Sequence, residues 1–212
     1  MGKKKSSVQE GGGMIKLTRL RAIPSKTLAL RMDATCRTSD DRRDALMEYV
    51  ECFLTRRGEL WPDIHRPIVY DIDDTLVTRT QDDIDVPIPR VVECYNRFVS
   101  QFPTYIVTAR IQDTGQTAAM LRQNGIRGYK GLYMRRPDED PAMFKWRARC
   151  AIASLNAGWH PQVTVGDQRW DVLPPHALNQ KDVTLSPKGS IVLHPMGHGE
   201  LGVYLPERQA HE

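Results

Sequence analysis

Several features that would place a protein in a common class are missing from this sequence. No apolar run approaches the roughly 20 residues that a membrane-spanning helix needs, so no transmembrane segment is expected. The four cysteines are far apart and form no CxxC pair, a spacing that suits neither a zinc site nor a disulfide framework. The chain also lacks a kinase P-loop and an aromatic-basic stacking pattern of the kind that binds single-stranded nucleic acid. These absences argue against a membrane protein, a cross-linked mini-domain and a nucleotide-binding kinase domain.

A large excess of charge is missing too. The formal net charge is only +4, and part of it belongs to three lysines within the first 13 residues, MGKKKSSVQEGGG. The charge therefore does not by itself indicate nucleic-acid binding. The same 13 residues have no apolar stretch of the kind that a signal peptide needs, so we expect an intracellular, cytoplasmic protein. Their composition predicts a flexible basic tail, and MGKKKS leaves open the alternative that Gly2 is myristoylated.

What is present is enough for one globular domain of ordinary size. Hydrophobic residues make up 40% and charged residues 26% of the 212 positions. Residues 14–60 are predicted to form an N-terminal segment of one strand (15–23) and one helix. Ser39, followed by two acidic residues, is the expected N-cap of that helix. Residues 61–212 are predicted to form the main domain, with C-terminal strands at one edge of its sheet.

From residue 67 onward, short apolar runs alternate with helical patterns. Four of these runs are predicted to be buried strands, at 68–71, 104–108, 131–134 and 162–166. Helices are expected to begin near Pro89, after Asp113 and near Pro141. Two later runs, 183–185 and 190–194, are expected to add to one edge. Repeated βα units predict an α/β fold with a parallel sheet, helices on both faces, and ligands at the carboxyl ends of the strands.

The first strand ends in a pair of carboxylates. Asp71 and Asp73 belong to the segment DIDDT, and two acids at this spacing suit covalent phosphoryl transfer. One would attack phosphorus, and the other would handle the proton of the leaving oxygen. A calcium loop is the competing interpretation, but an EF-hand beginning at Asp71 would need glycine at Leu76 and glutamate at Asp82. The calcium interpretation therefore fails on spacing.

The second strand and the helix after the third strand add groups that suit a phosphate. Thr108 ends the second strand beside Ala109, where a hydroxyl and exposed backbone amides can hold phosphate oxygens. Lys145 lies early in its helix and can neutralise phosphate and nucleophile together. Taken singly, Thr108 would be a turn residue and Lys145 a solvated lysine. Their positions at strand ends, in order with the acidic pair, favour the functional interpretation.

The fourth strand ends in two more carboxylates. Asp167 and Asp171 follow it in the segment GDQRWD. Carboxylate oxygens are the ligands that Mg²⁺ uses in proteins. Gathering this much negative charge in one cleft without a cation would be costly. The sequence therefore predicts a magnesium site at the carboxyl edge of the sheet.

Together these segments resemble the haloacid-dehalogenase-like (HAD) superfamily, and within it the acid phosphatases without a large cap domain. YDIDDTL resembles the first motif of that superfamily, YIVTAR the second, the lysine of MFKWRAR the third and VGDQRWD the fourth. The GDQxxD form, with GLYMR upstream, is similar to the plant vegetative-storage-protein and acid-phosphatase branch. The resemblance covers roughly residues 66–173. It implies a Rossmann-like α/β fold and a magnesium-dependent phosphomonoester hydrolase that acts through an aspartyl-phosphate.

The resemblance also implies a role for each matched residue. Asp71 would be the nucleophile and Asp73 the general acid and base. Thr108, Ala109 and Lys145 would bind the substrate phosphate. Asp171 would either lie beside the metal or orient the lysine. The implied Mg²⁺ site would be formed by Asp71, Asp73 through its backbone carbonyl, Asp167 and Asp171.

Two rival functions stay open at this point. One is a non-catalytic HAD-like structural or binding subunit, although both carboxylates of the first motif are present. The other is a nucleic-acid 3′-end phosphatase, which four arginines would support: Arg135, Arg136, Arg147 and Arg149. Neither gap between motifs has room for a folded cap, so the loop 78–87 is expected to roof an open site, either alone or with the N-terminal segment 14–60 or a partner chain. An open site admits a phosphate on a bulky carrier, so macromolecular substrates are among those expected.

Overall fold

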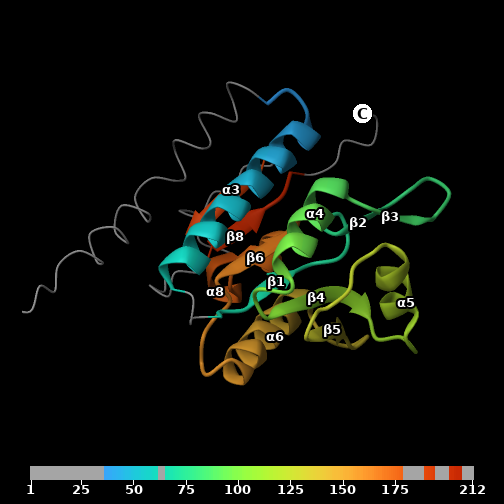
Figure 1. Ribbon diagram of the computed structural model, residues 1–212. Helices are drawn as coiled ribbons and strands as arrows, with labels where there is room; N and C mark the ends of the chain where they lie inside the picture. Colours follow the sequence, from blue (N-terminus) through green and yellow to red (C-terminus); the bar gives the residue numbers. More distant parts are fainter. Residues whose placement is uncertain (1–35, 62–64, 179–188, 194–200, 207–212) are drawn as a thin grey trace, which may run out of the picture.

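The structure is a computed structural model that describes residues 36–61, 65–178, 189–193 and 201–206 (Figure 1). The predicted basic tail and the predicted strands at 15–23 and 183–185 lie outside the described residues. No helix in the described ranges is both long enough and apolar enough to cross a membrane.

A six-stranded sheet forms the centre of the molecule, and five adjacent strands of it run parallel to one another. In spatial order the strands are β5 (Gly131–Arg135), β4 (Thr104–Ile111), β1 (Ile68–Tyr70), β6 (Val163–Gly166), β8 (Leu201–Tyr204) and β7 (Ser190–Leu193). The last of these, β7, runs antiparallel to β8. The predicted Rossmann-like α/β architecture is confirmed, including all four strands expected to carry the site.

Strand β8 was not predicted from the sequence. The run at 190–194 was expected to join the sheet, and β7 does so, but β8 lies between it and β6. A four-residue strand that contains a glycine gives a weak pattern on its own. It is stabilised by pairing along its whole length with β6 on one side and β7 on the other.

Helices cover both faces of the sheet, and the alternating side chains of β1 show which face each helix covers (Figure 1). Ile68 and Tyr70 pack in one core with buried residues of α3 (Ser39–Leu60), α4 (Pro89–Phe98) and α5 (Gln116–Gln123). Val69 points to the other face, where it packs with Phe144, Ala148 and Ile152 of α6 (Pro141–Leu155). Two short helices follow β6: α7 (Arg169–Val172) and α8 (Pro175–Leu178).

The N-terminus of α3 lies one residue from where the sequence placed it. The cap is Thr38 rather than Ser39: the Thr38 hydroxyl accepts from the Asp41 amide at 3.0 Å, and the Asp41 carboxylate accepts from the Thr38 amide at 2.9 Å. This reciprocal pair satisfies two amides that the first turn leaves free. The buried residues of α3, among them Leu46 and Val50, belong to the main core rather than to a roof over the strand ends.

A β-hairpin replaces the polar loop that was expected after the first motif. Strands β2 (Val77–Arg79) and β3 (Asp85–Pro87) pair antiparallel. The turn closes because the Thr80 amide donates to the Ile84 carbonyl at 2.9 Å, and the Thr80 hydroxyl accepts from the Ile84 amide at 3.2 Å. This hairpin and α4 fill the gap between β1 and β4, and α5 and β5 fill the gap between β4 and α6. Neither gap between motifs holds a cap domain.

Candidate active site

The register of the sheet brings the predicted strand-end residues to one edge. Tyr70, at the end of β1, pairs with Ile106 of β4 and with Val165 of β6. The next residue, Asp71, keeps this alignment because its amide donates to the Val165 carbonyl at 3.0 Å. Thr108 lies two residues after Ile106 in β4, and Asp167 lies two residues after Val165, just past the end of β6. The carboxyl ends of three adjacent parallel strands therefore carry the predicted groups, as the sequence indicated.

A cluster of buried carboxylates lies at this edge. Asp71, Asp167 and Asp171 each place a carboxylate oxygen within 4.8 Å of the others. Their exposed fractions are only 5%, 6% and 4%, which is far below what acidic side chains usually show. Ionised carboxylates that are this close together and this well shielded from water repel one another strongly.

One lysine balances part of this charge. Lys145, which is 1% exposed, lies in the second turn of α6. Its ammonium is 2.8 Å from the Asp71 carboxylate and also contacts the Asp171 carboxylate. If all four groups were ionised, three negative charges would face one positive charge. The cluster therefore has room, electrostatically, for a divalent cation.

The burial and crowding of these groups move their pKa values. Burial raises the pKa of Asp71 well above its usual value, and nearby Asp171 raises it further against the opposing effect of Lys145. Burial, again with Asp171, raises the pKa of Asp167 to about 6. Burial would lower the pKa of Lys145, but its ion pairs with Asp171 and Asp71 outweigh that effect and raise it. In the metal-free protein the cluster thus holds protons more tightly than isolated carboxylates do.

The donor set at the cluster fits Mg²⁺. The Oδ1 atom of Asp167 is buried and has no hydrogen-bond partner among the described residues, and the Asp71 Oδ1 atom has only the ion pair with Lys145. Asp171 differs, because its Oδ1 contacts Lys145 and its Oδ2 accepts from the Gln168 amide at 2.9 Å. Buried carboxylate oxygens with spare lone pairs are what a hard cation needs. Asp71 and Asp167 would therefore be its ligands, and Asp171 is placed to orient Lys145.

The turn that carries Asp167 and Asp171 is held from two sides. A β-carbon on Gly166 would overlap the Asp171 side chain, so only glycine permits this approach. On the other side, the Arg149 guanidinium donates to the carbonyls of Trp170 at 3.1 Å and Asp171 at 2.5 Å. It also donates to the carbonyl of Leu173 at 3.2 Å. The backbone of the turn is thereby fixed beside α6.

Sequence reasoning missed this role of Arg149. It counted Arg149 among four arginines that could support nucleic-acid binding, but the side chain is 5% exposed and bound to backbone carbonyls. Arg135 is likewise used internally, donating to the carbonyls of Ala109 and Glu139. Arg136 and Arg147 both pair with Glu139. The signal that could have identified Arg149 is its position four residues after Lys145, on the same face of α6.

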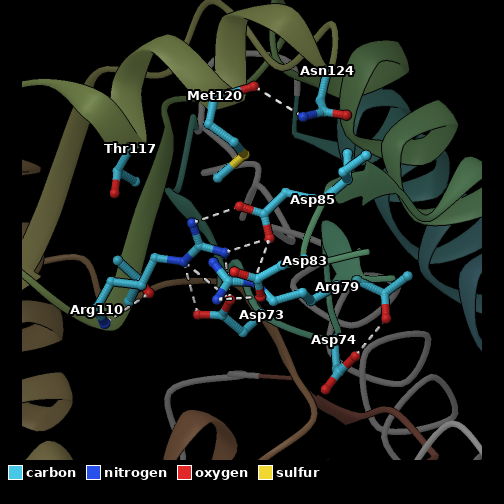
Figure 2. Close-up of polar contacts among 12 residues, drawn as sticks. Asp73, Asp74, Arg79, Asp83, Asp85, Arg110, Thr117, Met120 and Asn124 are labelled. Atoms are coloured by element: carbon cyan, nitrogen blue, oxygen red, sulfur yellow. Dashed lines mark hydrogen bonds and ion pairs between the residues drawn. The ribbon is translucent and has the colours of Figure 1, made fainter. Parts of the chain in front are cut away.

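The Asp73 side chain is not part of the carboxylate cluster but is bonded to Arg110. The Asp73 side chain is 52% exposed, and both of its oxygens accept hydrogen bonds from Arg110, at 2.6 to 3.1 Å (Figure 2). The same guanidinium donates twice to Asp85 of β3, at 3.1 Å each. Burial would raise the pKa of Asp85, but the bonds from Arg110 outweigh it and lower the pKa. Arg110 was not predicted as a site residue, and no short-range pattern marks it.

Thr108 and Ala109 lie where β4 leaves its regular pairing. Thr108 is fully buried, and its hydroxyl accepts from the Arg110 amide at 3.1 Å. The carbonyl of Ala109 accepts from Arg135 at 3.1 Å. The predicted role of both residues in binding phosphate stays a prediction.

The structure defines the protein as an α/β protein with a Rossmann-like sheet and a buried acidic cluster at its carboxyl edge. No family model and no curated protein sequence matches the chain. Among solved structures it is similar to a chain of the Pnkp1/Rnl/Hen1 RNA repair complex, with 14% identity and a TM-score of 0.43. That match covers 51% of this chain and 38% of the other.

A second similar structure is an uncharacterized protein from Listeria monocytogenes serotype 4b. It has 17% identity and a TM-score of 0.35, and the match covers 48% of this chain and 67% of the other. The chain thus spans well under half the length of the RNA repair protein. Because both similarities are this distant, function is inferred from the side chains of the site.

Binding of Mg²⁺ should stabilise the protein, and the effect should weaken at low pH. The folded, metal-free protein holds a proton on Asp167 with a pKa of about 6, above the ordinary 3.8. This raised pKa makes a contribution to the free energy of unfolding that is fully present below pH 3.8 and is lost as the pH rises through 6. Mg²⁺ competes with that proton. Thermal unfolding should therefore show a large Mg²⁺-dependent rise in Tm well above pH 6 and little rise well below it.

Asp167→Asn separates this expectation from a purely structural role. The variant removes one buried negative charge, so above pH 6 in EDTA it should unfold at a higher temperature than the wild type. It should also lose its response to Mg²⁺. Calorimetry would measure both responses. An equal rise in Tm with Mg²⁺ in the variant and the wild type would show that Asp167 does not bind the metal.

Proposed function

We propose that this protein is a magnesium-dependent phosphomonoester hydrolase in which Asp71 is transiently phosphorylated. The observation that carries the proposal is the buried cluster of Asp71, Asp167 and Asp171 around Lys145, at the edge of the sheet where α/β proteins bind ligands. Three buried carboxylates would destabilise a purely structural core, because removing each charge from water costs free energy. Their cost is explained if they act together with a cation and an anionic substrate.

Asp71 and Asp167 would hold Mg²⁺, which when bound would neutralise charge between the nucleophile and the phosphate. Lys145 would bind a phosphate oxygen while it stays paired to Asp171. Thr108 and the backbone around Ala109 would contribute further hydrogen bonds to the phosphate. The predicted participation of Asp73 in metal binding concerns its backbone carbonyl, because its side chain is held by Arg110.

The reaction would proceed in two displacements. A carboxylate oxygen of Asp71 forms a bond to phosphorus as the bond to the leaving oxygen breaks, and Asp73 in its acid form gives that oxygen a proton. Water then attacks phosphorus and passes a proton to Asp73 as the bond to Asp71 breaks. The products are an alcohol and inorganic phosphate, and both carboxyl groups return to their starting states. Asp73 is 52% exposed, and neither gap between the motifs holds a cap domain, so the site would admit phosphate on large carriers.

The test is a panel of phosphomonoesters assayed with Mg²⁺ and with EDTA. We expect hydrolysis of p-nitrophenyl phosphate and of several small esters in Mg²⁺, with low selectivity among them, and none in EDTA. Activity that is unchanged in EDTA would contradict the role of the carboxylate cluster. A purified protein that binds Mg²⁺ but hydrolyses no ester would favour the non-catalytic alternative.

A further inference from the structure

Arg110 lies at an irregularity of the sheet that turns its side chain toward the site. The pairing of β4 with β5 is regular up to Thr108, opposite Met134, and resumes at Ile111, opposite Arg135. Ala109 and Arg110 are therefore extra residues on β4. Such bulges redirect side chains and are common beside functional sites.

The bulge is fixed on both sides. The Thr108 hydroxyl accepts from the Arg110 amide at 3.1 Å, and Arg135 donates to the Ala109 carbonyl at 3.1 Å. The backbone that supports Arg110 is thus tied to one residue proposed to bind phosphate and to the neighbouring strand.

The side chain of Arg110 bridges two carboxylates from different elements (Figure 2). Its Nε and Nη2 atoms donate to Asp73, and its Nη1 and Nη2 atoms donate to Asp85 of β3. All three guanidinium nitrogens are used in this way, so Arg110 is poorly suited to bind substrate phosphate as well. Planar, two-point contacts of this kind fix orientation as well as distance.

The hairpin anchors the bridge. The Asp85 side chain is 12% exposed, against 52% for Asp73, so Asp85 is the more firmly held end. Arg79 also pairs with Asp85 at 3.5 Å and with Asp83 at 3.2 Å across the hairpin. On the other side of the turn, Asp74 accepts from the Thr78 hydroxyl of β2 at 2.8 Å. Both strands of the hairpin are therefore tied to the segment that carries Asp73.

We propose that Arg110 is a positioning residue that sets the orientation of Asp73, with Asp85 of the β2–β3 hairpin as its anchor. The inference rests on the proposed function for the chemistry of Asp73, but the bridge itself concerns only residues of this chain. The hairpin would then have a role in catalysis, because through Arg110 it would fix the position of the proton donor, Asp73. Loss of the bridge then weakens proton transfer to the leaving group and leaves phosphate binding intact.

The experiment compares two esters in Mg²⁺. Hydrolysis of an alkyl phosphate needs proton donation to the leaving oxygen, whereas p-nitrophenyl phosphate has a leaving group that needs little help. Arg110→Gln is expected to lower kcat for the alkyl ester by about tenfold to a hundredfold and for the aryl ester by under about threefold, with KM nearly unchanged. Asp85→Asn should give the same pattern more weakly, and Arg110→Lys should recover part of the loss.

A double-mutant cycle and an exchange measurement complete the test. Asp73→Asn should abolish the additional effect of Arg110→Gln, because both variants act on one proton transfer. Hydrogen exchange of hairpin amides 77–86 should accelerate in Arg110→Gln but not in Arg127→Gln, a control at an exposed arginine bonded to the Arg122 carbonyl.

The outcomes distinguish this inference from the proposed function. Equal losses on both esters, a raised KM, or additivity with Asp73→Asn would overturn the positioning role. Unchanged hairpin exchange in Arg110→Gln would overturn the bridge. A wild-type protein that hydrolyses neither ester would overturn the proposed function, and with it the catalytic part of this inference.

Discussion

Asp71→Asn should abolish phosphomonoester hydrolysis, lowering kcat by about 10⁴-fold or more, as loss of a nucleophile does in other enzymes. An amide oxygen cannot form the covalent bond to phosphorus under these conditions. The protein should remain folded, because the substitution keeps the shape of the side chain and the backbone bond to Val165. It also removes one of three crowded negative charges. Steady-state kinetics with p-nitrophenyl phosphate and circular dichroism would measure the two effects separately.

Asp83→Asn is the matched control for this variant. Asp83 is also a carboxylate, but it lies between β2 and β3 of the hairpin, is 80% exposed and pairs with Arg79. Its replacement should leave kcat within about twofold, as expected for a surface substitution. Acid quenching of the wild type during turnover, followed by mass spectrometry, should show one phosphoryl group on the peptide that contains Asp71. Wild-type turnover by Asp71→Asn would refute covalent catalysis at this residue.

The second large effect is expected for Lys145→Met, which should destabilise the protein by about 3–5 kcal/mol, the usual cost of leaving buried charges uncompensated. Lys145 is the cation that contacts Asp71 and Asp171, and methionine preserves its length without its charge. Activity should fall as well, with a higher KM and a lower kcat, since the proposed phosphate ligand is lost. Urea unfolding in EDTA would measure the stability.

Two further variants test this interpretation of Lys145. Lys145→Met combined with Asp171→Asn should recover part of the lost stability, because the double variant also removes a buried negative charge. Lys130→Met should be close to neutral, because Lys130 is exposed and lies before β5, at the opposite end of that strand from the site. A stability loss at Lys130 but not at Lys145 would contradict the assignment.

The sequence predicted the elements that the site needs most. The apolar runs ending in Asp71, Thr108 and Asp167 are short, buried and repeated at βα spacing, and that pattern leaves few alternatives to a parallel sheet. Because the carboxyl ends of parallel strands meet at one edge, the clustering of the carboxylates followed without any knowledge of distances.

The parts that were missed depend on tertiary contacts. The orientation of Asp73 depends on a two-residue bulge in β4 that aims Arg110, and no local pattern announces such a bulge. The hairpin depends on a turn closed between Thr80 and Ile84 in a largely polar segment, whose pattern does not indicate two strands. The function of Arg149 depends on three backbone carbonyls more than 20 residues away along the chain, and no sequence pattern marks a backbone carbonyl as the acceptor of a distant side chain.

The position of β8 has a consequence for biosynthesis. This strand is the parallel neighbour of β6, which leads directly to Asp167, yet it is made some 35 residues later in translation. The buried Arg43 of α3 likewise binds the carbonyl of Pro206, 163 residues further along. A nascent chain that ends before β8 leaves one edge of β6 unpaired, open to other chains or to chaperones. The proposed catalytic centre should therefore mature late, and ribosome-stalled fragments that end before β8 should be inactive and prone to aggregate.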